Sequence, residues 1–475
     1  MNFNSLEYAV FLPVVFAIYW LLPHKFRWPL LLVASYYFYM SWNPKYVVLI
    51  LLTTTVSFVA ARLLEKQEDN AARKGILAVT LIVCLGVLFF FKYFNFVSKS
   101  VATFFKLFAI NLHPVTLDLL LPVGISFYTF QTLSYVIDVY NRKVVPEKHF
   151  GIYATFISFF PQLVAGPIER TSNLLPQITS EKEFDYDLAM QGARQMLWGF
   201  FKKIAVADAV AVYVNAAYGN LLQCTGSDLL LAIFFFTVQI YCDFSGYSDI
   251  AIGTAKLFGI KLMTNFASPY FSLSVKEFWS RWHISLSTWF RDYVYIPLGG
   301  SRCSRLRNYA NLMITFLVSG LWHGADWKFI VWGGIHGIAQ VIEKILGLDK
   351  LPKGTAGKLL SWLIVFIFCN IAWVFFRADS FQDALYVIRH AVPDFGSLGS
   401  YMQSSIGLEK RKLRYLFAVI AIVGIYDFIS LKKDIIDVLK NKKIPCLILE
   451  YALIILIASA LINNAESSQF VYFQF

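Results

Sequence analysis

Apolar runs of about the length that crosses a lipid bilayer recur along this chain from its first residues to its last. A membrane-spanning helix needs roughly 20 apolar residues to cross a hydrocarbon core about 30 Å thick. Hydrophobic residues make up 58% of the 475 residues and charged residues only 15%, against about 25% in ordinary soluble domains. The pattern therefore predicts an integral membrane protein. The candidate spans are 6–22, 28–42, 46–63, 75–97, 117–137, 150–165, 189–218, 228–258, 309–322, 327–347, 359–377, 413–430 and 445–463.

Several of these candidates are short or are broken by Gly and Pro. Residues 158–170, "SFFPQLVAGPIER", are an example, and interrupted apolar segments are typical of re-entrant elements that line a cavity. We therefore expect an all-α polytopic membrane protein with about ten to twelve transmembrane or re-entrant helices. Because the apolar character runs from end to end without an internal repeat, we expect a single membrane domain over residues 1–475.

The net charge of +12 arises largely from basic residues in short loops between apolar spans. That is the pattern of membrane topology and not of a nucleic-acid-binding surface. No Lys or Arg precedes the first apolar segment, and "HKFR" (24–27) follows it, which predicts an uncleaved span with its N-terminus outside. A basic cytoplasmic face would also attract an anionic substrate, so both explanations of the charge stay open.

One stretch, 264–308, departs from the pattern of a lipid-facing helix. It is rich in aromatic residues, yet it carries several ionisable side chains. Because such groups are costly in contact with lipid, we expect this stretch at the cytoplasmic interface or along a polar cavity. Arg281 and Arg291 lie on either side of His283 and are candidates to bind the phosphates of a cytoplasmic substrate. The alternative for both arginines is the positive-inside rule, which requires no ligand.

A histidine within apolar sequence, His323 in "SGLWHGADW", is the strongest candidate for catalysis. An ionisable group in a membrane segment is a functional hypothesis by default. Trp322 would exclude water, and Asp326 would accept a hydrogen bond from one ring nitrogen and leave the other as a base. Gly320 and Gly324 would let backbone or ligand come close. The alternative is a histidine bonded to a backbone carbonyl inside a helix bundle.

Two further histidines lie in similar surroundings. His336, in "WGGIHGIAQ", is flanked by glycines and is a candidate for substrate binding or, equally, a packing residue of a helix. His283, in "FWSRWHISLS", could form a polar pair with His323. The six cysteines are scattered without metal-ligand spacing and are expected to be small buried hydrophobes. We expect no bound metal, no disulfide framework and no nucleic-acid partner.

Taken in order, the motifs of this chain resemble those of the membrane-bound O-acyltransferases, and among them the bacterial alginate O-acetyltransferase type. The resemblance covers most of the chain. One departure is Ser280, where the family commonly has a basic residue. The matching segments are "SFYTFQTLSYVIDVY" (126–140), "FFPQLVAGPIER" (159–170), "QIYCDFSGYSDIAIG" (239–253), "FWSRWHISLSTWFRDYVYIPLGG" (278–300), "GLWHGADWKFIVWGGIHG" (320–337) and "IAWVFFRADS" (371–380).

The resemblance implies a ring of membrane helices around a central funnel in a bacterial cytoplasmic membrane. It implies that His323 is the signature catalytic histidine and that His283 occupies the second active position. The implied reaction moves an acetyl group from a cytoplasmic thioester, such as acetyl-coenzyme A, to an extracytoplasmic polysaccharide. The thioester would be a donor substrate and not a bound cofactor, and an acyltransferase partner outside the membrane would complete the transfer.

The chain ends on "FVYFQF" (470–475), an aromatic motif around Tyr472. Relatives in this family often end in a similar motif, which implies that Tyr472 carries the acyl group with help from His323. A phenol with a pKa of about 10 needs a neighbouring base to act as a nucleophile at neutral pH. The alternative is an interfacial anchor, because Tyr and Phe collect at membrane surfaces.

Three other functions stay open. A secondary transporter would use buried histidines to relay protons, but it should show pseudo-symmetry between its halves. The donor could instead be D-alanine on a small carrier protein, transferred to teichoic acid. A scaffold of a secretion machine would need no catalysis, and the surroundings of His323 argue against it.

Overall fold

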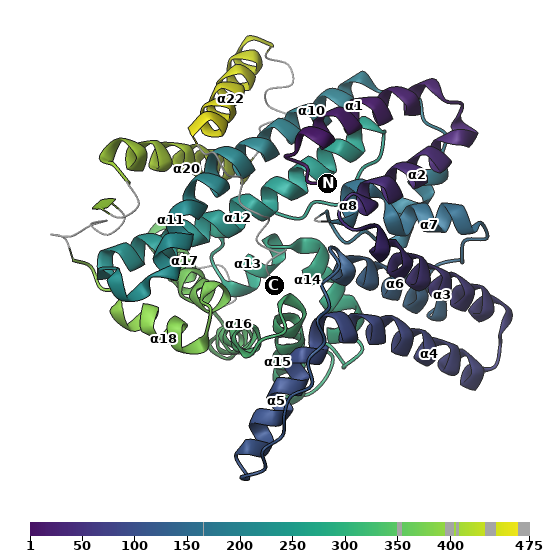
Figure 1. Ribbon diagram of the computed structural model, residues 1–475, viewed down its shortest axis with the longest axis horizontal. Coiled ribbons are helices and arrows are strands. Elements are labelled where there is room, and N and C mark those ends of the chain that lie inside the picture. The colour runs from purple at the N-terminus through teal and green to yellow at the C-terminus, as the bar shows by residue number, and fades with distance from the viewer. Residues whose placement is uncertain (165, 349–353, 395–402, 405–407, 433–442, 464–475) are drawn as a thin grey trace. The chain divides into compact units, whose positions relative to one another are not determined.

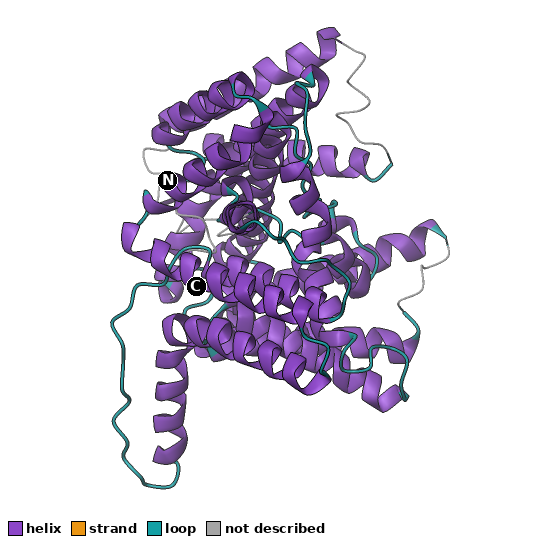
Figure 2. Ribbon diagram, turned by 90° about the vertical axis from the view of Figure 1, so that its right-hand side faces the viewer, coloured by secondary structure: helices purple, strands orange, loops and turns teal. Residues whose placement is uncertain are grey.

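A computed structural model of the chain describes residues 1–164, 166–348, 354–394, 403–404, 408–432 and 443–463 (Figure 1). Helices and the loops between them make up these ranges, and none of the described residues forms a β-strand (Figure 2). The predicted all-α class is confirmed. The aromatic motif 470–475 lies outside the described residues.

The chain forms two compact units, each built from two separate segments. Unit 1 comprises Met1–Ala193 with Ala251–Met263, and unit 2 comprises Arg194–Ile250 with Thr264–Phe475. The chain passes between them within helices α10 (Tyr186–Phe200) and α12 (Gly226–Leu257).

Unit 1 holds the interrupted helix that the sequence predicts. The helix α7 ends at Ser158, and Pro161 lies in the short α8. The Phe160 N–H is bonded to Ser35 Oγ (3.0 Å), and the Phe156 carbonyl accepts from the side chains of Gln131 and Gln162, each at 2.8 Å. The polar groups that the break releases are thus satisfied inside the protein, as apolar surroundings require. The helices are α1 Leu6–Leu21, α2 Arg27–Met40, α3 Val47–Lys66, α4 Asn70–Leu88, α5 Phe94–Lys106, α6 Ile125–Tyr140, α7 Phe150–Ser158, α8 Phe160–Leu163 and α9 Thr171–Thr179.

Unit 2 packs its helices around an aromatic core in which Trp282, Trp332 and Trp373 are fully buried. Two π-helical stretches, η4 (Phe201–Ala207) and η7 (Arg291–Tyr295), widen α-helical runs within it. The helices are α11 Asp208–Gly219, α13 Val275–Arg281, α14 Ile284–Phe290, α15 Arg305–His323, α16 Trp327–Leu346, α17 Thr355–Arg377, α18 Phe381–His390, α20 Lys410–Ser430 and α22 Lys443–Asn463.

Seven helices of the described part are long and apolar enough to cross a membrane, and Leu6–Leu21 is a shorter apolar helix. The stretch 264–308 contributes none of them. The seven segments are Pro44–Lys66, Asn70–Lys106, Gly226–Leu257, Trp327–Leu346, Thr355–Arg377, Lys410–Ser430 and Ile444–Ile462. A polytopic membrane protein is therefore confirmed, whereas the total of ten to twelve crossing or re-entrant helices stays a prediction.

Glycines bring α15 and α16 into close contact. A Cβ added to Gly320 would overlap the carbonyl oxygen of Phe329, and one added to Gly333 would overlap that of Phe316. Small residues at such positions let two helix backbones approach each other, as in other membrane helix pairs. Gly320 therefore serves helix packing, which is one of the two uses that the sequence suggests for it.

Candidate active site

The segment that carries His283 begins with an arrangement that is similar to a capping box. Ser274 is the N-cap of α13, and its Oγ accepts from the Glu277 N–H (3.0 Å), while Glu277 Oε2 accepts from the Leu273 N–H (2.7 Å). Such reciprocal bonds satisfy N–H groups that the helix itself cannot use. A second carboxylate, Glu343 of α16, accepts from the Val275 N–H at 2.5 Å. The start of α13 is thus held from its own sequence and from α16.

His283 lies between α13 and α14 with a left-handed backbone, at φ 44° and ψ 54°. This conformation costs a non-glycine residue roughly 1–2 kcal/mol, so the surroundings must hold it. The side chain is fully buried, and its Nδ1 lies 3.1 Å from Asn265 Oδ1. Burial lowers the pKa of His283 to about 3, and the ring is therefore neutral at physiological pH.

Three histidines and two indole rings are linked by successive ring contacts, and we call this set the histidine row. The ring of Trp322 is 6.1 Å from His283 and 5.0 Å from His323, measured between centroids. The ring of Trp332 is 4.9 Å from His323 and 5.0 Å from His336. The structure thus brings together the three histidines that the sequence singles out, and Trp322 contacts both His283 and His323.

His323 is the last residue of α15 and is only 2% exposed. Besides the two indoles, the ring of Phe376 packs edge-on against it at 5.6 Å. These rings enclose the imidazole in apolar surroundings, as expected for a base that must work away from water. Asp326, predicted to bond His323, is exposed, and its Oδ1 accepts from the Lys328 N–H (2.9 Å) as the N-cap of α16.

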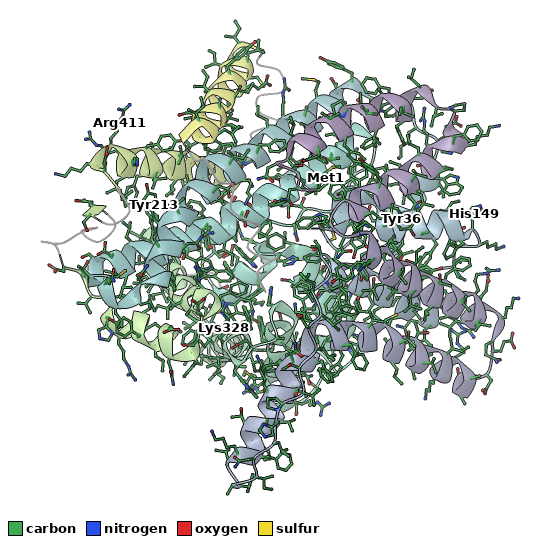
Figure 3. All side chains as sticks on the ribbon, viewed as in Figure 1. Met1, Tyr36, His149, Tyr213, Lys328 and Arg411 are labelled. Carbon is green, nitrogen blue, oxygen red and sulfur yellow. The ribbon has the colours of Figure 1, made fainter. Side chains whose placement is uncertain are left out.

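The start of α16 is fixed a second time by the side chain of Lys328, which is labelled in Figure 3. Its Nζ donates to the Ala378 carbonyl at the end of α17 (2.7 Å). The turn between His323 and α16 is thus tied to a third helix, so the position of His323 depends on contacts far away in the sequence.

His336 is hydrogen-bonded to a tryptophan. Its Nδ1 accepts a hydrogen bond from Trp279 Nε1 (3.2 Å), because an indole nitrogen can only donate. In the neutral ring the proton is then on Nε2. Trp279 lines the cavity described next, whereas His336 is fully buried behind it. The geometry favours a residue that orients the cavity wall over one that binds substrate directly.

A cavity of about 550 Å³ adjoins this row within unit 2. Trp279 and Phe316 form part of its wall, and both rings also contact His336. Three cations and one carboxylate line it, namely Lys276, Arg291, Lys344 and Glu343. Hydroxyl groups line it as well, from Ser280, Ser287, Thr288, Ser301, Thr315 and Ser319.

The two predicted arginines have different places. Arg291 lines the cavity, and its Nε is 2.8 Å from Asp292 Oδ1. Arg281 is not among the lining residues, and it pairs with Glu277 at 2.7 Å. Lys276 and Lys344 line the cavity instead. Lys276 stands one helical turn before Ser280, and that spacing is the signal by which it could have been found.

Beyond the cavity, the sequence "CDFSGYSD" of α12 holds a buried ionic network that its polar pattern alone did not predict. Lys203 Nζ lies 2.8 Å from Asp208 Oδ1 and 2.7 Å from Asp243 Oδ1. Its neighbour Lys202 reaches Asp249 at 2.5 Å and Ser245 at 2.8 Å. Both lysines lie in the π-helical stretch η4. These aspartates therefore contribute to the packing of unit 2.

The comparisons with known proteins agree with the helical membrane fold. Residues 147–378 match the model of the membrane-bound O-acyltransferase family. The chain is 39% identical over 423 residues to a probable alginate O-acetylase, AlgI, of Pseudomonas aeruginosa, covering 88% of this chain and 80% of that protein. It is 36% identical over 414 residues to the peptidoglycan O-acetyltransferase of Helicobacter pylori, covering 80% and 78%.

A more distant similarity covers less of the chain. A teichoic acid D-alanyltransferase of Streptococcus thermophilus is 30% identical over 288 residues, which is 55% of this chain and 69% of that protein. Together with the histidine row and the membrane helices, these findings identify the protein as a member of the membrane-bound O-acyltransferase family. It is a multi-pass membrane enzyme that transfers acyl groups to oxygen.

Proposed function

We propose that this enzyme takes an acetyl group from a cytoplasmic thioester and delivers it across a bacterial cytoplasmic membrane for O-acetylation of an extracytoplasmic polysaccharide. The observation that carries the proposal is the cationic cavity that adjoins the buried histidine row. Alginate is the first acceptor to test, because the probable alginate O-acetylase of P. aeruginosa is similar over most of the chain.

The donor would enter through the cavity. Lys276, Arg291 and Lys344 suit the phosphate groups of a coenzyme A thioester. The hydroxyl groups of the wall suit the amides of its pantetheine arm, and the aromatic wall at Trp279 suits the apolar end. Glu343 is the one carboxylate there, and its oxygens accept from backbone N–H groups of α13. The cavity is therefore favourable for an anion.

His323 would serve as the base in the acyl transfer. It takes the proton of the attacking hydroxyl while the hydroxyl oxygen forms a bond to the thioester carbonyl carbon. The carbon–sulfur bond then breaks, and the departing sulfur receives that proton as a thiol. Trp322 and Trp332 keep water away from His323, which limits hydrolysis of the thioester.

Tyr472 would be the first acceptor of the acetyl group, and a partner acyltransferase outside the membrane would pass it to the polysaccharide. Tyr472 lies outside the described residues, so this step rests on the resemblance of "FVYFQF" to the terminal motif of relatives. A Tyr472→Phe variant should express normally and lose polymer acetylation in cells. Retained acetylation would rule out the relay while leaving the role of His323 intact.

Purified protein in liposomes, supplied with radiolabelled acetyl-coenzyme A, tests the proposal. The wild type should release free coenzyme A with transfer of label to protein or to added acceptor. A His323→Ala variant should lose about 10²–10⁴-fold of that rate, the range that a general base contributes. Equal rates in the two proteins would contradict the assignment of His323. A transporter would carry label into the liposomes without transferring it.

D-alanyl transfer is the second candidate, because the chain is similar to a teichoic acid D-alanyltransferase. The two donors differ in their cytoplasmic part, since a carrier protein docks by its surface, whereas coenzyme A presents its phosphates to the cations of the cavity. A Lys276→Ala and Arg291→Ala double variant should raise KM for acetyl-coenzyme A at least tenfold. Activity only with a D-alanyl carrier protein would favour the second candidate.

A further inference from the structure

Asn265 is a buried amide whose polar contacts converge on His283. It lies in the loop that follows α12, and its side chain is fully buried. Its Oδ1 is 3.1 Å from His283 Nδ1, 2.9 Å from Ser285 Oγ and 3.3 Å from the Ser285 N–H. Its Nδ2 donates to Ser248 Oγ of α12 (3.1 Å).

These contacts determine which ring nitrogen of His283 carries the proton. A backbone N–H can only donate, so the atom of Asn265 that faces Ser285 must be the oxygen. That oxygen accepts and cannot donate, and His283 Nδ1 must therefore be the donor in their contact. In the neutral ring, the lone pair then belongs to Nε2, which is the nitrogen able to accept a proton.

The backbone around Asn265 also holds the left-handed conformation of His283. The carbonyl of Asn265 accepts from the Ile284 N–H (2.9 Å), and the Ala267 N–H donates to the Arg281 carbonyl (3.0 Å). The loop is thus bonded to the chain on both sides of His283. A residue held at φ 44° by bonds on both sides has a conformation set by its surroundings.

One face of α12 supports this arrangement from behind. Phe244 packs edge-on against the His283 ring with centroids 4.5 Å apart, and Ser248, one turn later, holds Asn265. Asp243 and Asp249 flank these two residues on α12, and they pair with Lys203 and Lys202. The ring of Phe244 and the hydroxyl of Ser248 are thus held by a helix whose flanking aspartates form an ionic network.

We propose that Asn265 is a positioning residue, which fixes His283 as the Nδ1–H tautomer and presents Nε2 as a proton acceptor in acyl transfer. The aromatic rings facing His283 are Phe244 from α12, Phe266 from the same loop as Asn265 and Trp322 from α15. The titratable groups on these elements include Asp243 and Asp249 of α12, which pair with lysines, Tyr241 of α12, which packs on Phe266, and His323, which contacts Trp322. The rate part of the test rests on the proposed function, whereas the unfolding part does not.

Asn265→Asp is the informative variant, because it keeps the size and the acceptor oxygen while adding a negative charge beside His283. Ser248 Oγ can reverse its bond and donate to the new carboxylate. The charge favours imidazolium, so the rate should fall at a higher pH than in the wild type. The ratio of the rate at pH 5.5 to the rate at pH 8 should be at least threefold smaller in the variant than in the wild type.

A second variant, Asn265→Ala, should lower kcat at least tenfold and leave KM for the acetyl donor nearly unchanged.

Thermal unfolding in detergent provides a readout that needs no activity. Between pH 7.5 and pH 5 the unfolding temperature should fall more in the wild type than in Asn265→Asp. In the variant, the new carboxylate is a partner for the protonated form of His283. Asn370→Ala is the control, because it removes an amide that bonds Thr237 and the carbonyl of Phe366 and adds no titratable group. It should change stability without changing the pH dependence.

Two results would overturn the inference. One is an equal loss of rate at every pH in Asn265→Ala and Asn265→Asp, which would indicate packing alone. The other is an unfolding temperature of Asn265→Asp that depends on pH as the wild type does. If the wild type itself transfers no acetyl group, the proposed function fails, and the unfolding measurement still decides the role of Asn265. If Asn265→Ala does not fold, Asn265→Asp carries the test.

Discussion

The three histidines differ in what holds each ring, although the sequence places all three in similar aromatic and glycine-rich surroundings. His283 bonds the amide of Asn265, and His336 accepts from the indole of Trp279. His323 lies between the rings of Trp322 and Trp332. Each imidazole thus has its own set of bonded or packed neighbours, and Trp322 and Trp332 each contact two of the three rings. Each histidine contributes to a different part of the site.

The buried state of His283 predicts an acid-sensitive stability. Its pKa is about 3 in the folded protein against an ordinary value of 6.5. The neutral His283 therefore contributes to the free energy of unfolding. This contribution is complete above pH 6.5 and is lost as the pH falls from 6.5 towards 3, because the unfolded chain binds the proton first. The loss at pH 5 is about 2 kcal/mol. His283→Asn should therefore show a smaller drop in unfolding temperature between pH 7.5 and pH 5 than the wild type.

The matched control is His113→Asn, which replaces an exposed histidine of a loop in unit 1. Its pH dependence should equal that of the wild type. An unchanged pH dependence in His283→Asn would show that His283 is already accessible to protons in the folded protein.

Among the helices, the pair α15 and α16 positions the site most directly. The two helices are in contact along their length. His323 is the last residue of α15, and Trp332 and His336 lie within α16. Glycines at the contact let the two backbones approach closely. The distances between rings of the histidine row therefore depend on the small size of these glycines. The helix α12 contributes differently, with Phe244 and Ser248 towards His283 and two aspartates towards buried lysines.

Two adjacent glycines of α16 should respond very differently to the same substitution. A Cβ at Gly333 would overlap the Phe316 carbonyl, whereas one at Gly334 would lie 3.5 Å from Leu317 Cδ2, an ordinary contact. We expect Gly333→Ala to destabilise the protein by about 1–3 kcal/mol and to lower acyl transfer. Gly334→Ala should be neutral or slightly stabilising, because Ala favours a helix. Thermal unfolding of both variants in detergent checks this, and equal effects would contradict the packing argument.

For the whole molecule, the proposed use of a cytoplasmic donor requires the cavity to open on the cytoplasmic side of the membrane. Ser301 lines the cavity, and Arg302, Arg305 and Arg307 follow it closely in the sequence. Short loops rich in Arg are typical of the cytoplasmic side. Cys303 lies in the same loop and is exposed, which corrects the expectation that the cysteines are all buried. The reason is that this loop is a turn at the surface and not part of an apolar helix.

Cys303 therefore provides a test of orientation without any added cysteine. A membrane-impermeant maleimide should label the wild type in inside-out vesicles and leave it unlabelled in intact spheroplasts. Cys303→Ser should abolish most labelling, because the other five cysteines are buried or half-buried. Labelling from the outer side would place the cavity on the wrong face for a cytoplasmic thioester.

Much of the architecture could be predicted from residue order. Apolar runs separated by short loops predicted the helical membrane fold, since only satisfied backbone can lie in lipid. The interruption of the apolar run 158–170 was predicted from its Pro and Gly residues. His283, His323 and His336 stood out because an ionisable group among apolar neighbours is a functional hypothesis. The helix count and the single domain could not be judged in this way, because short or polar helices carry a weak signal.

What the sequence by itself determined is the class of the protein, its periodic helices and the three histidines, because these depend on local composition. The tertiary structure decided how those histidines are separated, that Asn265 holds His283, and that Lys276 and Lys344 line the cavity instead of Arg281. Those features depend on side chains that are far apart in the chain and meet only when the helices pack. The spacing of residues along a helix predicts which of them share a face. Which other helix or loop packs against that face depends on the tertiary structure.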